Sequence, residues 1–178
     1  MNNIAINGFG RIGRSILRII IESNSDLNVV AINDLGNYQN LSYLLKHDSV
    51  MGVLDHDVKL DGDILKIDDR NIKLVSVADP AELPWKEMNI DIVIESTGIF
   101  ADRKSLEKHI EAGAKKVVLT VPPKDAIDAT VVLGVNDEDI KEEVDEFIYN
   151  DNDPLVQDAK RNMEQREVDD KSYPPETE

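Results

Sequence analysis

Three glycines near the start of the chain have the spacing of a phosphate-binding turn. Gly8, Gly10 and Gly13 form a G-x-G-x-x-G pattern directly after the apolar run at residues 3–6. In such a turn the first glycine permits a tight bend, the second lets the main chain approach a pyrophosphate, and the third lets a helix lie close to a sheet. The N-terminus of the following helix would offer N–H groups and the positive end of its dipole to the phosphates. The pattern therefore predicts dinucleotide binding.

An acidic residue stands where a dinucleotide site needs one. Asp34 follows Gly13 by 21 residues and comes directly after a second apolar run. A carboxylate at this point can accept hydrogen bonds from both ribose hydroxyls, and it repels a 2′-phosphate. Glycines at a strand-to-helix turn can be purely structural, but a strand, a helix and an acidic residue in the right order favour a nucleotide site. We expect the cofactor to be NAD rather than NADP.

The elements that would position these residues alternate between strand and helix. Short continuous apolar runs predict strands buried on both faces, and apolar residues at helical spacing predict helices between them. Strands are expected at 3–6, 27–33, 91–95, 116–120 and 130–133, an antiparallel excursion at 58–77, and helices from 11 to the break at 23–25, from a cap at 37 to about 46, and from about 104 to 112. The predicted fold class is α/β, a doubly wound, mostly parallel sheet of the Rossmann type.

Composition narrows the classes of function. The 178 residues include no cysteine, and 36 acidic residues against 20 basic ones give a formal net charge of −16. Most of the excess lies at residues 137–178, which carry 16 acidic and 5 basic residues. Such a segment repels phosphate backbones and anionic lipids, so we expect no nucleic-acid partner and no membrane partner. No apolar run approaches the ~20 residues of a membrane span, and no secretory signal is recognised, so a cytoplasmic location is expected.

Seven blocks of sequence then identify a family. In order, they are IAINGFGRIGR, AINDL, YLLKHDSVMG, DPAELPW, DIVIESTGIF, EAGAKKVVLT and VVLGVND. With these blocks the chain strongly resembles the NAD-binding half of glyceraldehyde-3-phosphate dehydrogenase, over about residues 3–143. The resemblance implies a glycolytic oxidoreductase that acts on an aldehyde with NAD.

The resemblance also implies which residues bind the cofactor. It places Asn7, Arg11 and Ile12 at the pyrophosphate and Asn33 with Asp34 at the adenosine ribose. Thr97, Gly98 and Phe100 would form the wall beside the adenine and the nicotinamide half, and Thr120 would lie near the nicotinamide. The expected cofactor-binding set is Asn7, Gly8, Phe9, Gly10, Arg11, Ile12, Gly13, Asn33, Asp34, Thr97, Gly98, Phe100 and Thr120.

The chain departs from the family pattern in two places. Ala78 stands where the family often carries an arginine near the adenine, so one polar adenine contact is expected to be missing. The family's catalytic segment, I-S-N-A-S-C-T-T-N, has no counterpart, and aligning its Ile and Asn with Ile148 and Asn150 places Asp153 at the nucleophilic cysteine. A carboxylate is a far poorer nucleophile toward an aldehyde than a thiolate. No catalytic residue is therefore expected, and the chain is predicted to bind NAD but to be inactive alone.

The three histidines are not expected to replace the missing thiol chemistry. They are His47, His56 and His109, and each is given an ordinary surface or core role.

The predicted organisation is a Rossmann NAD(P)-binding domain at 1–148 and an acidic tail at 149–178, a short helix followed by disorder. Leu155, Ala159 and Met163 have helical spacing, so residues 155–167 either cover apolar surface or have no docking site. Three functions stay open at this point: a catalytically silent NAD-binding module, the product of a truncated or rearranged dehydrogenase gene, and an interaction protein. In the last, the acidic tail would engage a basic partner, such as a full-length dehydrogenase, or the chain would associate with itself.

Overall fold

A computed structural model describes residues 2–23, 25–132 and 134–136 of the chain. The chain divides into two compact units, Met1–Ile127 and Asp128–Glu178, and all helices and strands given below belong to the first. The predicted tail helix at 155–167 and the disordered end lie outside the described residues. Within the described part of the chain, no helix is long and apolar enough to cross a membrane.

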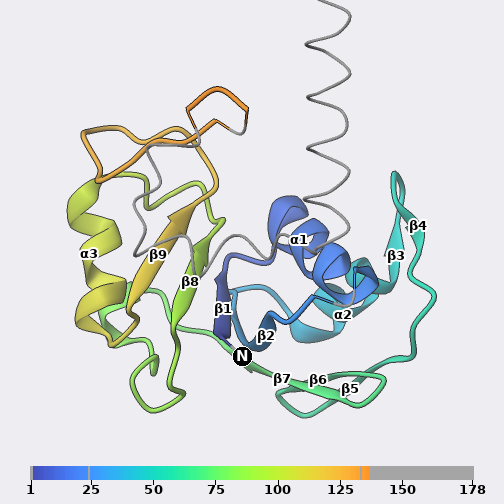
Figure 1. Cartoon of the computed structure of the whole chain (residues 1–178). Helices are drawn as coiled ribbons and strands as arrows, with labels where there is room; N and C mark the ends of the chain where they lie inside the picture. Colours follow the sequence, from blue (N-terminus) through green and yellow to red (C-terminus); the bar gives the residue numbers. More distant parts are fainter. Residues whose placement is uncertain (1, 24, 133, 137–178) are drawn as a thin grey trace, which may run out of the picture. The chain divides into compact units, whose positions relative to one another are not determined.

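A seven-stranded sheet forms the centre of the first unit (Figure 1). Its strands are β1 (Asn3–Asn7), β2 (Asn28–Asn33), β5 (Val58–Asp61), β6 (Ile64–Ile67), β7 (Arg70–Val75), β8 (Ile92–Glu95) and β9 (Lys116–Leu119). Their order across the sheet is β5-β6-β7-β2-β1-β8-β9. Strand β1 pairs in parallel with both β2 and β8, whereas β6 pairs antiparallel with β5 and with β7. The mostly parallel sheet and its antiparallel excursion are both as predicted.

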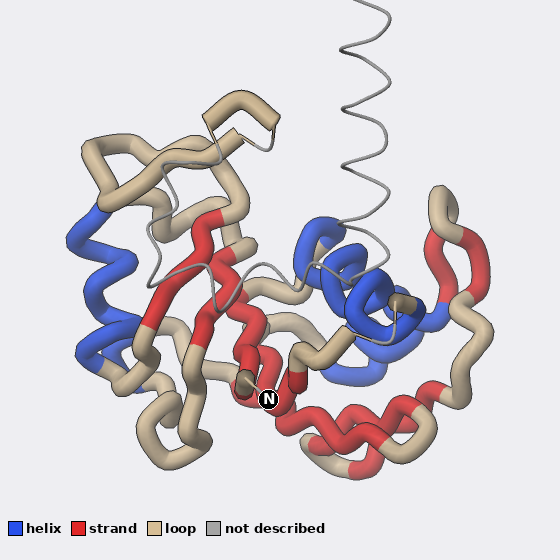
Figure 2. Tube along the Cα trace, viewed as in Figure 1, coloured by secondary structure: helices blue, strands red, loops and turns tan. Residues whose placement is uncertain are grey.

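Helices connect the parallel strands on alternate faces of the sheet. They are α1 (Arg11–Glu22), α2 (Tyr38–Lys46), α3 (Arg103–Glu111) and the short 3-10 helix η1 (Pro80–Glu82), with a two-stranded ribbon of β3 (His47–Asp48) and β4 (Gly52–Val53) after α2. Helices α1 and α2 lie on one side of the central strands and α3 on the other (Figure 2). The chain is therefore doubly wound, with its switch point between β1 and β8.

Local sequence explains where these helices begin. The Asn37 side chain accepts hydrogen bonds from the main-chain N–H groups of Gln39 and Asn40, so α2 begins at Tyr38. The Asp102 side chain caps α3 in the same way, by accepting a hydrogen bond from Ser105 N. Helix α3 therefore begins at Arg103, one residue before the start expected from the periodicity. Helix α1 differs from these two helices, because no side chain caps its N-terminus.

The core has two halves because side chains alternate across each strand. Ile4, Ile6 and Ile32 are buried on the face that α1 covers. The opposite face holds a cluster around the fully buried Trp85, formed by Ala5, Ala31, Leu83, Trp85, Ile90, Val93 and Ala114. The small alanines of β1 and β2 leave room for the large indole ring, so a tryptophan can pack directly against the sheet.

The strand predicted at 130–133 is wrong for the described residues 130–132. There the main chain is bonded within a turn: Val135 N donates to Val132 O, and Asn136 Oδ1 accepts from Val132 N at 2.8 Å. The Asn136 amide also donates to Thr130 O at 2.8 Å. A side chain and a local turn thus satisfy groups that a strand would offer to a neighbour.

Candidate functional site

The turn between β1 and α1 requires two of its three glycines for steric reasons. Gly8 has a φ of 91°, and a Cβ there would lie 2.6 Å from Thr97 N. A Cβ on Gly13 would lie 2.3 Å from Gly8 O and 3.0 Å from Ile6 Cγ2, between α1 and the sheet. These contacts confirm the tight bend and the close helix–sheet packing predicted from the spacing. Any side chain at either position would force the main chain to move.

Gly10 differs, because nothing in the fold requires a glycine there. Its φ is −71°, and a Cβ would meet no atom within 4 Å. Gly10 is exposed and is the N-cap of α1, which has no side-chain cap and no acidic residue in its first turn. The N–H groups that begin any helix lack partners within that helix. Open space in front of such donors suits a phosphate oxygen.

Asp34 lies beside this turn and is fixed by it. Its Oδ2 accepts from Phe9 N at 2.7 Å, and its Oδ1 accepts from Gly36 N at 2.7 Å. Gly8 N donates to Asn33 O at 2.8 Å, which joins the turn to the end of β2. A carboxylate has about four acceptor positions, so two are left for the hydroxyls of a ribose.

The carboxyl ends of β1 and β8 form the other side of the site. Ser96 Oγ donates to Gly8 O at 2.6 Å and lies 3.1 Å from Asn7 O. The following turn at Thr97 and Gly98 is partly open, since Gly98 is exposed and a Cβ there would meet nothing within 4 Å. Ligands of doubly wound sheets bind in the crevice at this switch point.

The structure sorts the predicted residues by what they can present to a ligand. Those with exposed or partly exposed atoms near the turn or the crevice are Gly10, Arg11, Ile12, Asp34, Thr97, Gly98 and Phe100. Asn7, Phe9 and Asn33 have side chains that are 5% exposed or less. Thr120 follows β9, and its hydroxyl donates to Glu95 O at 3.0 Å. The buried members can therefore shape the site, but their side chains face the protein.

Sequence reasoning missed a buried polar cluster directly behind the crevice. The Glu95 side chain, fully buried, accepts from Thr97 N at 2.8 Å and from the Thr97 hydroxyl through Oε1. Its Oε2 lies 2.5 Å from Asn7 Nδ2 and 3.1 Å from His109 Nε2. Trp85 Nε1 donates to His109 Nδ1 at 3.0 Å. Because an indole N–H can only donate, His109 accepts at Nδ1 and carries its hydrogen on Nε2.

The cluster continues toward the ribose side of the crevice. Asn33 Nδ2 donates to Asn7 Oδ1 at 2.7 Å and to Val77 O at 2.9 Å, while Asn33 Oδ1 accepts from Val77 N at 2.9 Å. The signal that could have revealed the cluster is a carboxylate, Glu95, at the end of a wholly apolar strand. Such a residue cannot remain buried without several donors.

The other two histidines have local partners. His56 Nδ1 lies 2.6 Å from Asp68 Oδ2, and the His47 ring packs against Tyr43 with ring centroids 4.6 Å apart. Of the three, only His109 contacts the cluster behind the crevice among the described residues.

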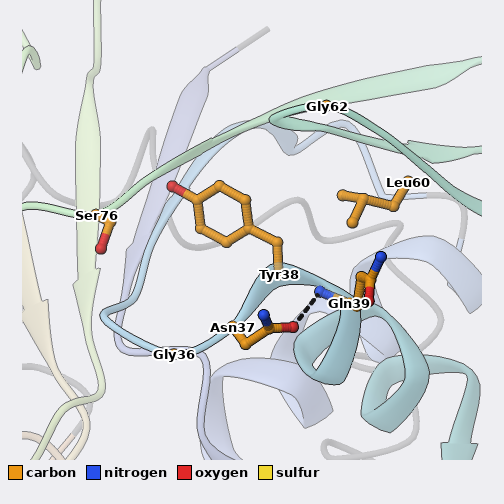
Figure 3. A pocket seen from close by; sticks show the side chains of 7 residues that line it. All are labelled: Gly36, Asn37, Tyr38, Gln39, Leu60, Gly62 and Ser76. Atoms are coloured by element: carbon orange, nitrogen blue, oxygen red, sulfur yellow. Dashed lines mark hydrogen bonds between the residues drawn. The ribbon is translucent and has the colours of Figure 1, made fainter.

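A shallow cavity of about 480 Å³ begins two residues after Asp34 (Figure 3). It is lined by Gly36, Asn37, Tyr38, Gln39, Leu60, Gly62 and Ser76. Burial raises the pKa of the Tyr38 phenol, and the nearby Asp63 raises it further. The lining offers an aromatic face, two amides and two hydroxyls but no cationic side chain. It therefore suits an uncharged group better than a phosphate.

Comparison with known proteins agrees with this geometry. The family model described as "Glyceraldehyde 3-phosphate dehydrogenase, NAD binding domain" matches residues 2–103. The chain is 53% identical over 142 residues to glyceraldehyde-3-phosphate dehydrogenase A, chloroplastic, of Chlamydomonas reinhardtii, covering 79% of this chain and 38% of that protein. Glyceraldehyde-3-phosphate dehydrogenase of Thermotoga maritima is 49% identical over 144 residues, covering 80% and 43%. The chain spans about two fifths of the length of these relatives.

Proposed function

The chain belongs to the glyceraldehyde-3-phosphate dehydrogenase family through its NAD-binding domain, and we propose that this domain binds NAD on its own without oxidising an aldehyde. One observation carries the proposal: Gly10, which no contact in the fold requires, leaves open space before the uncapped N-terminus of α1. Asp34 stands next to it, held by Phe9 N with two acceptor positions to spare. A pyrophosphate followed by a ribose fits this pair of features.

We assign roles to the exposed predicted residues accordingly. The main-chain N–H groups at the start of α1 would hold the pyrophosphate, with Arg11 and Ile12 beside it. Asp34 would hold the adenosine ribose, and the turn at Thr97 and Gly98 would form the opposite wall with Phe100. When NAD is bound, its nicotinamide ring is the group that can accept a hydride.

Three details support a preference for NAD and a moderate affinity. The Asp34 carboxylate would repel a 2′-phosphate, and no cation lines the adjacent cavity. Ala78 is exposed after β7 and offers no polar group to an adenine. The affinity for NAD is therefore proposed to exceed the affinity for NADP. The affinity for NAD is also proposed to be lower than it would be with an arginine at position 78, because one polar contact to the adenine is missing.

The absence of oxidation is proposed from the chemistry of the residues present. The family's reaction needs a thiolate to attack the aldehyde, and the 178 residues contain no cysteine. Asp153, which aligns with the nucleophile, lies outside the described residues. Truncation of a dehydrogenase gene stays a prediction. Finding a remnant of a catalytic domain in another reading frame of the DNA that follows the codons of these 178 residues would support it, and an unrelated sequence there would contradict it.

We also propose a cytoplasmic location, as expected from the sequence, and, on the basis of the net charge of −16, no nucleic-acid or membrane partner. Some relatives are chloroplastic by name, so a fluorescent fusion in cells is the direct test. Association with itself or with a full-length dehydrogenase is a further proposal. Sedimentation of the chain with and without residues 137–178 tests both the association and the contribution of the acidic segment.

Isothermal titration with NAD, NADP and AMP tests the main proposal. We expect NAD to bind and NADP to bind more weakly. No heat of binding at millimolar NAD would overturn the proposal. In a parallel assay with glyceraldehyde 3-phosphate, phosphate and NAD, no NADH absorbance should develop. The same mixture with a full-length dehydrogenase of the family is the positive control.

A further inference from the structure

We propose that His109 is a positioning residue for the nucleotide site, and that it acts through Glu95 on Thr97 and Asn7. The inference rests on the proposed binding of NAD at the switch point. His109 lies on α3 and is fully buried, so its side chain is not exposed to the crevice. Its effect would come from the fixed position that it gives to the Glu95 carboxylate, 3.1 Å away.

Glu95 connects the crevice wall to the interior. Among the described residues its carboxylate accepts four hydrogen bonds: two from Thr97 through Oε1 and two through Oε2, from Asn7 and His109. A carboxylate that is fully buried must keep these donors, because water cannot replace them. Both the main-chain N–H and the hydroxyl of Thr97 donate to Oε1, so the position of the Thr97–Gly98 turn depends on the position of this carboxylate.

His109 fixes the carboxylate because its own ring cannot rotate freely. The Trp85 indole donates to Nδ1 at 3.0 Å and stacks beside the ring at 23°, with centroids 6.4 Å apart. A flip of the imidazole would lose the bond to Trp85 or the bond to Glu95. The ring thus fixes the Glu95 carboxylate, at the end of β8, relative to α3 and Trp85.

The same carboxylate reaches the ribose side of the crevice through two asparagines. Glu95 accepts from Asn7, Asn7 accepts from Asn33, and Asn33 makes two hydrogen bonds to Val77. Asn33 ends β2 and directly precedes Asp34. One connected network therefore sets both walls of the site, with His109 and Trp85 at its inner end.

Packing alone does not account for a polar network at this position. Its neighbours in the same core are alanines, leucine, isoleucine and valine. Apolar groups of similar volume are often as stabilising as buried charged groups, and sometimes more so. The network's distinctive property is geometric, since hydrogen bonds are directional and apolar contacts are not. We infer that this directionality serves the crevice, whose two walls it joins.

Three variants separate positioning from stability. His109→Leu removes both polar bonds of the ring, whereas His109→Gln keeps an amide that can donate to Glu95 and accept from Trp85. Leu83→Ala is the matched control, since Leu83 is 4% exposed in the core cluster around Trp85, the residue that bonds His109, but has no polar side chain. We expect the Kd for NAD to rise about tenfold in His109→Leu, to recover largely in His109→Gln, and to change less than about twofold in Leu83→Ala.

A second readout needs no ligand. Hydrogen exchange of the Thr97 amide, measured by NMR in the free protein, should accelerate in His109→Leu beyond its rate in Leu83→Ala at equal loss of thermal stability. If the unmutated chain does not bind NAD, the proposed function fails, and the exchange of Thr97 still decides the role of His109. Equal effects of His109→Leu and Leu83→Ala on Thr97 exchange would overturn the inference. So would an NAD affinity unchanged in His109→Leu.

Discussion

The main-chain N–H of Phe9 donates to Oδ2 of Asp34 at 2.7 Å, so the residue after β2 holds the glycine-rich turn after β1. The other carboxylate oxygen holds Gly36 N. Asp34 thus has a structural task in addition to the ribose contact proposed for it. A substitution at this position should affect stability and NAD affinity together, and the two effects can be measured separately.

Asp34→Ala should weaken NAD binding by about 1–3 kcal/mol, because charge-assisted hydrogen bonds to the ribose are lost. Isothermal titration measures this change, and urea unfolding measures the accompanying loss of stability. Asp26→Ala is the control, since Asp26 is exposed and no described residue bonds its side chain. An unchanged dissociation constant in Asp34→Ala would contradict the placement of the ribose.

The glycines of the turn should separate folding from binding. Gly13→Ala should cost about 3 kcal/mol of unfolding free energy, because its Cβ would lie 2.3 Å from Gly8 O. Gly10→Ala should cost about 1 kcal/mol or less, since an alanine N-cap is only modestly worse than glycine and the space is open. Urea unfolding measures both.

Gly10→Ala should weaken NAD binding much more than it lowers the stability of the fold. A methyl group there would occupy the space in front of the helix N-terminus, so the Kd for NAD should rise about tenfold or more in Gly10→Ala. Titration of the folded variant with NAD measures it. An affinity equal to that of the unmutated chain would show that the pyrophosphate does not approach Gly10.

The elements that hold the site could be predicted because their signals are local. Apolar runs identified β1 and β2, and Asn37 marked the start of α2 to the residue. Local signals gave a wrong prediction for the strand at 130–133. Its apolar residues resemble a strand, yet the described part forms a turn closed by the Asn136 side chain, a contact that no periodicity encodes.

The buried network could not be predicted from local signals for a related reason. His109 is 102 residues from Asn7 in the sequence, and their side chains meet because β1 pairs with β8, which places Asn7 beside Glu95, and because His109 on α3 reaches the same carboxylate. Read alone, His109 is one polar residue on a helix. Glu95 carried a signal, since it ends a buried strand, but two of its three partner residues, Asn7 and His109, reach it only through the tertiary fold.

Arg18 should be the most costly single charge to remove from the α1–α2 side of the fold. Its guanidinium is 1% exposed and donates to the carbonyls of Leu45, Lys46 and Gly52, at the C-terminal end of α2 and in the ribbon that follows. Arg18→Leu should lower the unfolding free energy by about 3 kcal/mol, because the buried carbonyl of Leu45 and the partly buried carbonyls of Lys46 and Gly52 would lose their donor. Urea unfolding followed by circular dichroism measures it.

Arg18→Lys is the informative comparison. A lysine keeps the charge but cannot present a planar fork of donors to several carbonyls. We expect it to recover less than half of the loss. Full recovery would show that charge next to the helix terminus, rather than the geometry of the guanidinium, stabilises this region.

Asp91 should make the stability of the sheet depend on pH. Its carboxylate accepts from Lys115 Nζ at 2.6 Å and from Asn3 N at 2.8 Å, which joins the residue before β8 to the start of β1. The Lys115 ammonium, followed by the Asn3 N–H, holds the pKa of Asp91 below its ordinary value. The ionised form is thus bound more favourably in the folded state than in the unfolded chain.

Because the folded pKa is depressed, the stabilisation is fully present above the unfolded pKa of about 3.9 and is lost as the pH falls through the folded value. Asp91→Asn should therefore cost about 1 kcal/mol near neutral pH, since Lys115 is largely exposed and its contribution is screened. The difference from the unmutated chain should shrink as the pH falls below about 4. Urea unfolding at several pH values measures it, with Asp26→Asn as the exposed control. A difference that stays constant down to the lowest pH would mean that the amide disturbs packing and that the carboxylate charge contributes nothing.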